Sequence, residues 1–584
     1  MGTAFTADTP LKVAQYGIDS VISIVDDVLL ERLRKVYSEK NNLPYIEIHK
    51  SSEDARANRI TSYLNLVNDL SQLKLKELTN LSKDKFEEVK KYFDILPETS
   101  SIKKDFFQII NNSFSFDDLK EWLSENLSLG SIDVNIMTKV DKKNYSKNIE
   151  LPSEFNDAHA ALRGYAQSNL ESSVIFSAGM NPRLYGYIGQ FKDFYPNKYG
   201  YIKKKIVLKV SDYRSAVIQG KFLAKKGLWV SEYRIESGLN CGGHAFATDG
   251  LLMGPILAEF RDNRQELIDQ TSDVLFQALE RDERIIPEKK LELKVTAQGG
   301  VGTSVEQSFL VDYYKLDSVG WGTPFLLVPE ATTVDDKTRE QLLKAKENDL
   351  YLSNVSPLGV PFNNLRNNSK DIEKIEKIND GKPGSNCPRR FLALSSEYGD
   401  KGICTASRQF QKIKIKEIDE NSSINFAKVV DKTCLCMGLA AAAVVNYDIK
   451  NSESKTVSIC PGPNLAYFSK YMSLKEISSQ IYGMSRNIAR FDRPHMFIKE
   501  LDLYINYISD KLVESSRDFD KKQAKYFDKF LNNLNDGIFY YTDLFGGVQT
   551  KFSQSKENMF NDLDVFRKKL STLTQKVDAL ISDI

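Results

Sequence analysis

The chain has 584 residues, 41% of them hydrophobic, and 80 basic against 79 acidic side chains give a net charge near +1. This length and apolar content predict one large core with additions, arranged as two or three domains. A charge balance so close to zero gives no electrostatic reason to expect a nucleic-acid partner. No apolar run is long enough for a membrane span, and the first residues, MGTAFTADTPLK, lack a secretory signal's apolar core. Six cysteines do not make a disulfide scaffold, so we expect a cytoplasmic protein.

Short apolar runs alternate with stretches of helical periodicity over the first part of the chain. In chain order, we expect strands at 11–15, 132–137, 173–177, 206–210, 230–235, 291–297 and 317–319, with 350–353 as the candidate for an eighth. A helix is expected at 18–36, between the first two strands. This alternation is typical of βα units around a parallel sheet. The fold class we expect is α/β, a (β/α)8 TIM barrel.

Three regions differ in composition. Residues 1–365 are expected to form the barrel, with a polar, charged helical insertion at about 51–130. Residues 366–472 hold five of the six cysteines and form a predicted Cys-rich module. Residues 473–584 have helical periodicity with many Lys and Asp, which predicts a helical C-terminal tail.

Two glycine clusters directly follow successive predicted strands. Residues 299–303 read GGVGT before a predicted helix, and residues 320–323 read GWGT. Backbone N–H groups can approach a phosphate closely where side chains are absent, and the positive end of a following helix adds to the attraction. Two such loops at the carboxyl ends of neighbouring strands predict a shared phosphate site, although each alone could be an ordinary strand–helix turn.

The order of CGGH at 241–244, QGGVGT at 298–303 and GWGTPFLLVPEAT at 320–332 resembles the nitronate monooxygenase family of FMN-binding TIM barrels. More loosely, it is similar to inosine monophosphate dehydrogenase and the FMN domain of glutamate synthase. The resemblance is specific only from about residue 205 to 332. It implies FMN as the cofactor, with its phosphate on the two glycine loops. The implied cofactor-binding residues are Asn135, Lys209, Glu236, Gly242, Gly243, Gln298, Gly299, Gly300, Gly302, Thr303, Gly320, Trp321, Gly322 and Thr323.

The same resemblance implies that His244 faces the flavin as a base or a hydrogen-bonding partner for substrate. Cys241, three residues earlier, stands where the family has a small residue. Its thiol could be a nucleophile or proton donor, or a small buried side chain. Lys209 and Glu236, at strand ends, could contact flavin or substrate, but a buried structural ion pair is the favoured interpretation.

The remaining cysteines are Cys387, Cys404, Cys434, Cys436 and Cys460. Two of them precede proline, as in the last ligand of bacterial ferredoxin motifs, but no C-x-x-C spacing is present. An iron–sulfur cluster beside the flavin, a zinc site and unrelated buried thiols are the alternatives, and the first is favoured over zinc.

These observations predict an FMN-dependent oxidoreductase that acts on a small organic substrate, by nitronate oxidation or by reduction of a C=C bond. NAD(P)H or a redox protein is the expected electron donor, no membrane partner is expected, and a homo-oligomer is left open. The alternative from another class is a flavin-barrel scaffold or RNA-associated factor that acts through the Cys-rich module and helical tail.

Overall fold

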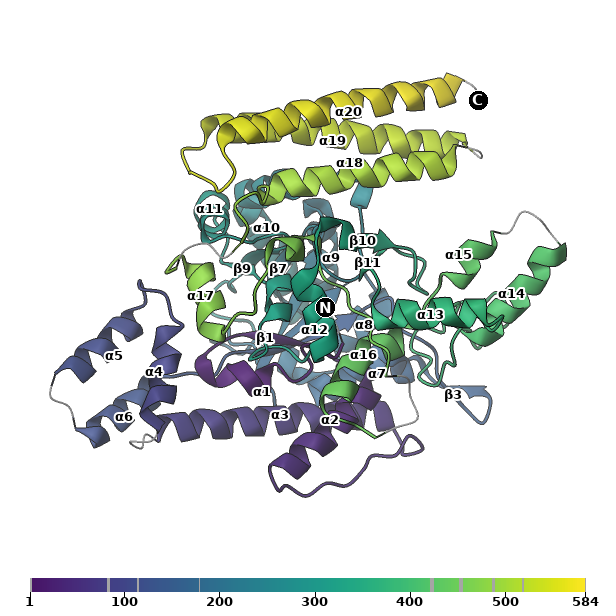
Figure 1. The fold of residues 1–584 in the computed structure, drawn as a ribbon. Coiled ribbons are helices and arrows are strands. Elements are labelled where there is room, and N and C mark those ends of the chain that lie inside the picture. Colours follow the sequence, from purple (N-terminus) through teal and green to yellow (C-terminus); the bar gives the residue numbers. More distant parts are fainter. Residues whose placement is uncertain are drawn as a thin grey trace.

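The protein was studied as a computed structural model, which describes residues 3–80, 85–112, 115–177, 179–420, 425–450, 455–485, 489–516 and 519–582. At its centre is a parallel seven-stranded sheet in the order β1-β2-β5-β6-β7-β8-β9 (Figure 1). These strands are β1 (Ser20–Ser23), β2 (Ile132–Met137), β5 (Ser172–Ser177), β6 (Lys204–Val210), β7 (Val230–Glu236), β8 (Lys294–Gln298) and β9 (Ser318–Gly320). The predicted α/β class with a parallel sheet is confirmed.

The first predicted strand, at 11–15, is wrong. Helix α1 (Pro10–Val13) begins at a proline, whose fixed φ suits the first helical position. A 3-10 turn then ends at Gly17, in the left-handed region at φ 72°. The first strand is instead β1, whose Ser20 lies opposite Ile132 of β2. The helix predicted at 18–36 therefore begins only at α2 (Asp27–Lys40), where the Asp26 carboxylate caps the helix.

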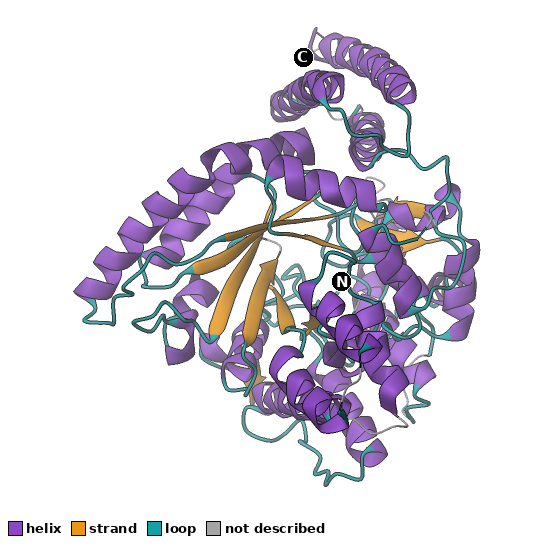
Figure 2. Ribbon diagram, turned by 90° about the vertical axis from the view of Figure 1, so that its left-hand side faces the viewer, coloured by secondary structure: helices purple, strands orange, loops and turns teal. Residues whose placement is uncertain are grey.

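The predicted eighth strand exists but does not join the main sheet. β10 (Leu350–Ser353) pairs antiparallel with β11 (Phe362–Leu365) as a separate hairpin. The short connection between them permits only antiparallel pairing. The described part of the chain thus forms a curved seven-stranded sheet, seen side-on in Figure 2, and not the expected eight-stranded barrel.

Helices surround this sheet. The remaining helices near the sheet are α7 (Asp157–Ala166), α8 (Pro182–Ile188), α9 (Tyr213–Ala224), α10 (Met253–Arg281), α11 (Ser304–Tyr314), α12 (Asp336–Lys344), α13 (Ser369–Asn379), α14 (Arg408–Glu420), α15 (Phe426–Val430), α16 (Leu435–Asn446) and α17 (Leu474–Tyr482). A small hairpin of β3 (Tyr145–Ser146) and β4 (Ile149–Glu150) follows β2. None of the described helices combines the length and apolar character that crossing a membrane would need.

The segment between α2 and β2 forms four helices: α3 (Ala55–Thr79), α4 (Phe86–Asp94), α5 (Ser101–Asn111) and α6 (Phe116–Asn126). The last three project from the body of the molecule (Figure 1). They enclose a small core of their own, in which the rings of Phe93 and Phe106 stack 3.8 Å apart. The residues predicted as a helical insertion are therefore helical.

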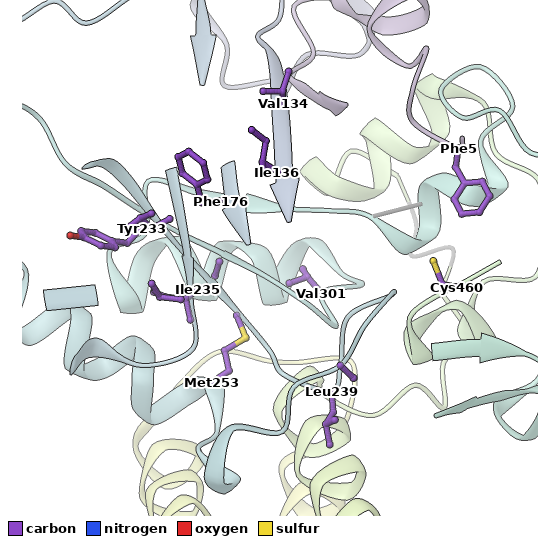
Figure 3. Close-up of a cluster of buried hydrophobic side chains, with 14 of the residues drawn as sticks. Phe5, Val134, Ile136, Phe176, Tyr233, Ile235, Leu239, Met253, Val301 and Cys460 are labelled. Atoms are coloured by element: carbon purple, nitrogen blue, oxygen red, sulfur yellow. The ribbon is translucent and has the colours of Figure 1, made fainter. Parts of the chain in front are cut away.

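Three long helices close the chain: α18 (Met496–Ser515), α19 (Lys521–Gly547) and α20 (Lys556–Ser582). They lie side by side above the sheet in Figure 1. One continuous buried cluster includes residues from Ala4 to Val577. Figure 3 shows part of it, with strand residues such as Val134 and Tyr233 on one side and Cys460, from the later part of the chain, on the other. The predicted limits at 365 and 472 stay predictions, but residues on both sides of each limit share this core.

One buried carboxylate joins these helices to the sheet. Glu500 of α18 accepts hydrogen bonds from the Ser237 hydroxyl after β7, from the Met253 N–H at 3.0 Å and from the Tyr541 hydroxyl at 3.3 Å. Burial outweighs these bonds and raises the pKa of Glu500 to about 7.

This shift predicts a pH-dependent stability. A carboxyl group whose pKa rises on folding supports the folded state below its unfolded pKa and loses that contribution as the pH rises through the folded value. We expect the free energy of unfolding to lose on the order of 3 kcal/mol from this group between about pH 5 and pH 8. Urea unfolding across that range, compared with Glu500→Gln, measures it. The glutamine stays neutral, so an unchanged pH dependence in the variant would contradict the assignment.

Candidate functional site

A cavity of about 350 Å³ lies at the carboxyl ends of the strands. Its polar wall comes from strand ends and the loops after them, including Asn135, Ser177, Lys209, Glu236, Gly242, Gly243 and His244. Its apolar wall comes mainly from the later part of the chain, through Phe362, Phe391, Leu392, Leu435 and Leu439. The size is at the lower end of the range for small-molecule sites, and ligands in α/β sheets bind at this edge.

Asn135 lies within β2 and lines the cavity. Its side-chain Oδ1 is buried and has no hydrogen-bond partner within the described residues. A buried acceptor left unpaired costs free energy, so such an atom at a cavity wall indicates a ligand that donates to it. A ring N–H of a flavin is a donor of this kind.

The carboxyl ends of β6, β7 and β8 carry a connected polar group. The Lys209 ammonium forms an ion pair with the Glu236 carboxylate, and the Gln298 amide donates to Glu236 Oε1 at 2.6 Å. Burial alone would raise the pKa of Glu236, but Lys209 and Gln298 outweigh it and lower the pKa. The Glu236 carboxylate is therefore charged at neutral pH. Lys209 and Glu236 line the cavity. Gln298 lies outside the lining and contacts it through its hydrogen bond to Glu236.

The CGGH loop, residues 241–244, packs closely against the backbone of Cys460, and this contact constrains its two glycines. A Cβ on Gly242 would lie 2.6 Å from the Cys460 carbonyl oxygen. Gly243 has a left-handed φ of 83°, and its N–H donates to the same carbonyl at 3.1 Å. Packing therefore requires glycine at 242, and the left-handed backbone conformation favours glycine at 243. This packing brings the His244 side chain to the cavity.

His244 is held on two sides. Its Nε2 lies 2.7 Å from the Ser356 hydroxyl, and its ring packs against Phe362, with centroids 4.9 Å apart. Burial lowers the pKa of His244 to about 4. The imidazole is therefore neutral at physiological pH, with one nitrogen as a donor and the other as an acceptor.

Cys241 is less suited to nucleophilic chemistry. Burial, followed by the charge of Glu236, raises the pKa of the Cys241 thiol well above its usual value. Its Sγ lies 3.7 Å from the Gln298 carbonyl oxygen. The thiol stays protonated at neutral pH, and the thiolate is the reactive form. The geometry favours the interpretation of Cys241 as a half-buried packing residue.

The first glycine loop lies beside the cavity, outside the residues that line it. A Cβ on Gly299 would meet Cys241 Sγ at 2.7 Å, and one on Gly300 would meet the Asn240 amide at 2.1 Å. The Gly302 N–H donates to Glu306 Oε2 at 3.0 Å, so this donor is occupied by the protein itself. Thr303 caps α11 by accepting a hydrogen bond from the Glu306 N–H.

The second glycine loop is more open. A Cβ on Gly322 would have no atom within 4 Å, whereas one on Gly320 would touch Gln298. The Trp321 indole donates to Gln307 Oε1 at 2.6 Å, which ties this loop to α11. Thr323 Oγ1 accepts from the Gly462 N–H at 3.1 Å.

The residues of the cavity and of the two glycine loops can now be compared with what FMN would require. The unpaired Asn135 acceptor suits the polar edge of a flavin ring, and the open space at Gly322 suits a phosphate beside the N-terminus of α11. The predicted site residues thus fall into two neighbouring groups, one at the cavity and one on the glycine loops. We conclude that they fit FMN.

The metal prediction finds no support. Within the described residues, no group of three or more His, Cys, Asp or Glu side chains could hold a metal ion. All six cysteines are free thiols. The residues predicted as ligands were Cys387, Cys404, Cys434, Cys436 and Cys460. Burial raises the pKa of Cys434, Cys436 and Cys460, whereas the hydrogen bond with Cys404 lowers the pKa of Cys387 to about 7. Cys436 and Cys460 instead line the cavity, so we do not carry an iron–sulfur or zinc site further.

Sequence reasoning missed the apolar wall. Phe362, Phe391 and Leu435 lie far along the chain from the CGGH loop, the first at the end of the predicted barrel and the other two in the predicted Cys-rich module. Backbone contacts such as the antiparallel bridge of Phe362 to His244 and the hydrogen bond of Gly243 to Cys460 bring these segments to the loop. No local pattern in the sequence predicts these contacts.

No protein-family model and no curated protein matches the sequence. Among solved structures, the chain is similar to FabK from Thermotoga maritima at 16% identity, over 68% of this chain and 86% of that one, with a TM-score of 0.31. It is also similar to the enoyl reductase domain of MlnA from the macrolactin biosynthesis cluster of Bacillus amyloliquefaciens. That match has 12% identity and a TM-score of 0.35, over 66% of this chain and 86% of that one. The proposed function therefore rests on the residues of the site.

Proposed function

We propose that the protein is an FMN-dependent oxidoreductase that acts on a small organic substrate. The observation that carries the proposal is the buried, unpaired Asn135 acceptor in the cavity beside two glycine loops that resemble an FMN phosphate site. Asn135 would hold the flavin ring, and residues 299–303 and 320–323 would hold the phosphate. When bound, FMN would supply transfer of a hydride or of single electrons.

The protein's own groups would orient the substrate and manage its proton. The neutral His244, fixed by Ser356, can accept or donate one proton without changing its position. The Lys209–Glu236 pair provides a fixed dipole at the polar wall. The apolar wall excludes water, which favours a compact, weakly polar substrate such as a nitroalkane or an electron-poor alkene.

The purified full chain tests the proposal. We expect it to show the absorbance bands of an oxidised flavin, to release FMN on denaturation, and to lose the bands under anaerobic reduction. If the protein is colourless and does not bind added FMN, the proposal is wrong. RNA in such a preparation would support the RNA-associated alternative instead.

A further inference from the structure

The chain after about residue 365, here called the C-terminal region, lies outside the family resemblance. It makes a set of buried contacts to the first glycine loop, residues 299–303. Three consecutive carbonyl groups of this loop each accept a hydrogen bond from a different C-terminal side chain. The Gly300 carbonyl accepts from Arg493 Nη2, the Val301 carbonyl from Asn464 Nδ2 at 2.9 Å, and the Gly302 carbonyl from Gln480 Nε2 at 3.0 Å. All three donor side chains are at least nine-tenths buried.

These bonds set the direction of the loop's N–H groups. In a trans peptide, the carbonyl of one residue and the N–H of the next point in opposite directions. Tying back the Gly300 and Gly302 carbonyls therefore turns the N–H groups of Val301 and Thr303 away from the C-terminal region. Neither N–H has a protein partner within the described residues. Two backbone donors are thus held in place at the N-terminal end of α11.

Arg493 also controls the charge beside the loop. Its Nη1 donates to Glu306 Oε1 at 2.8 Å, and both side chains are only 3% exposed. Burial alone would raise the pKa of Glu306, but Arg493 outweighs it and keeps the pKa low, so the carboxylate is charged. Without Arg493, that charge would repel a phosphate on the same loop.

We propose that Arg493, supported by Asn464 and Gln480, is a positioning residue for the cofactor phosphate. It holds the glycine loop in its anion-binding conformation and neutralises Glu306. This inference rests on the proposed function. It assigns to the C-terminal region a direct role in selecting a phosphorylated flavin over its unphosphorylated form.

The test compares the dissociation constants of FMN and riboflavin, which lacks the phosphate, in the full chain freed of bound flavin. In Arg493→Met, we expect FMN binding to weaken at least about tenfold, the range of a lost charge-assisted hydrogen bond, with riboflavin binding little changed. Gln480→Met releases only the Gly302 carbonyl and keeps the ion pair, so it serves if Arg493→Met does not fold. We expect it to weaken FMN binding roughly threefold.

Arg490→Gln is the matched control, because Arg490 lies three residues before Arg493 and contacts Glu347 and Asp492. It should leave the FMN-to-riboflavin ratio unchanged. A ratio that is unchanged in Arg493→Met, or in Gln480→Met where the former does not fold, would overturn the inference. An equal loss of both flavins would do the same, since it indicates a general structural role. A wild-type chain that binds neither flavin would instead refute the proposed function itself.

Discussion

Gly322→Asp should weaken FMN binding by about 100-fold while the chain stays folded. The residue has room for a side chain, since a Cβ there would have no atom within 4 Å, and its φ of −127° lies outside the left-handed region that favours glycine. The new carboxylate would face the phosphate. A pair of like charges about 5 Å apart at an effective dielectric constant of about 20 costs roughly 3 kcal/mol. Titration of the flavin-free protein with FMN, followed by flavin fluorescence, measures the loss.

Gly322→Asn is the matched control, because its amide has the same shape as the carboxylate without the charge. It should bind FMN within a few-fold of the wild type. Gly300 is a poorer site for this test, since it has a left-handed φ of 77° and a Cβ there would lie 2.1 Å from the Asn240 amide. Equal FMN affinity in both Gly322 variants would show that no phosphate binds beside this loop.

His244→Ala should leave flavin bound but slow turnover by about 100-fold or more, the range for loss of a general acid or base. The side chain is neutral because burial lowers its pKa to about 4, so the wild-type rate should not depend on His244 ionisation near neutral pH. Turnover is measured on a nitroalkane or an electron-poor alkene, whichever the wild type consumes, and flavin content is measured by absorbance.

Ser356→Ala tests how much of the effect of His244 depends on the hydrogen bond that orients its imidazole. The hydroxyl contacts His244 Nε2 at 2.7 Å and is fully buried. Its loss should lower the rate less than His244→Ala, because the ring stays packed on Phe362. Wild-type turnover in His244→Ala would place this histidine among structural residues only.

The sequence alone was enough to locate strands and helices wherever a short stretch carries a clear hydrophobic pattern. The apolar run within β6 and the apolar–polar alternation of β7 mark strands, and the helix between them implies parallel pairing. Because parallel strands align their carboxyl ends, Lys209 and Glu236 could be grouped before any contact was known, whereas Asn135 and His244 were added to the group by the family resemblance. The glycine loops were identified by the same logic.

Only the tertiary structure decided which partner each segment meets. Leu350–Ser353 has the pattern of a strand, but pattern does not specify whether it joins the main sheet or pairs with Phe362–Leu365. The 11–15 segment is apolar, yet the proline before it and Gly17 after it favour a helical turn. The cysteines were grouped by composition, whereas the fold places Cys436 and Cys460 in the cavity wall. Contacts such as Arg493 with Gly300 join residues nearly two hundred positions apart, and only burial of the shared core brings them together.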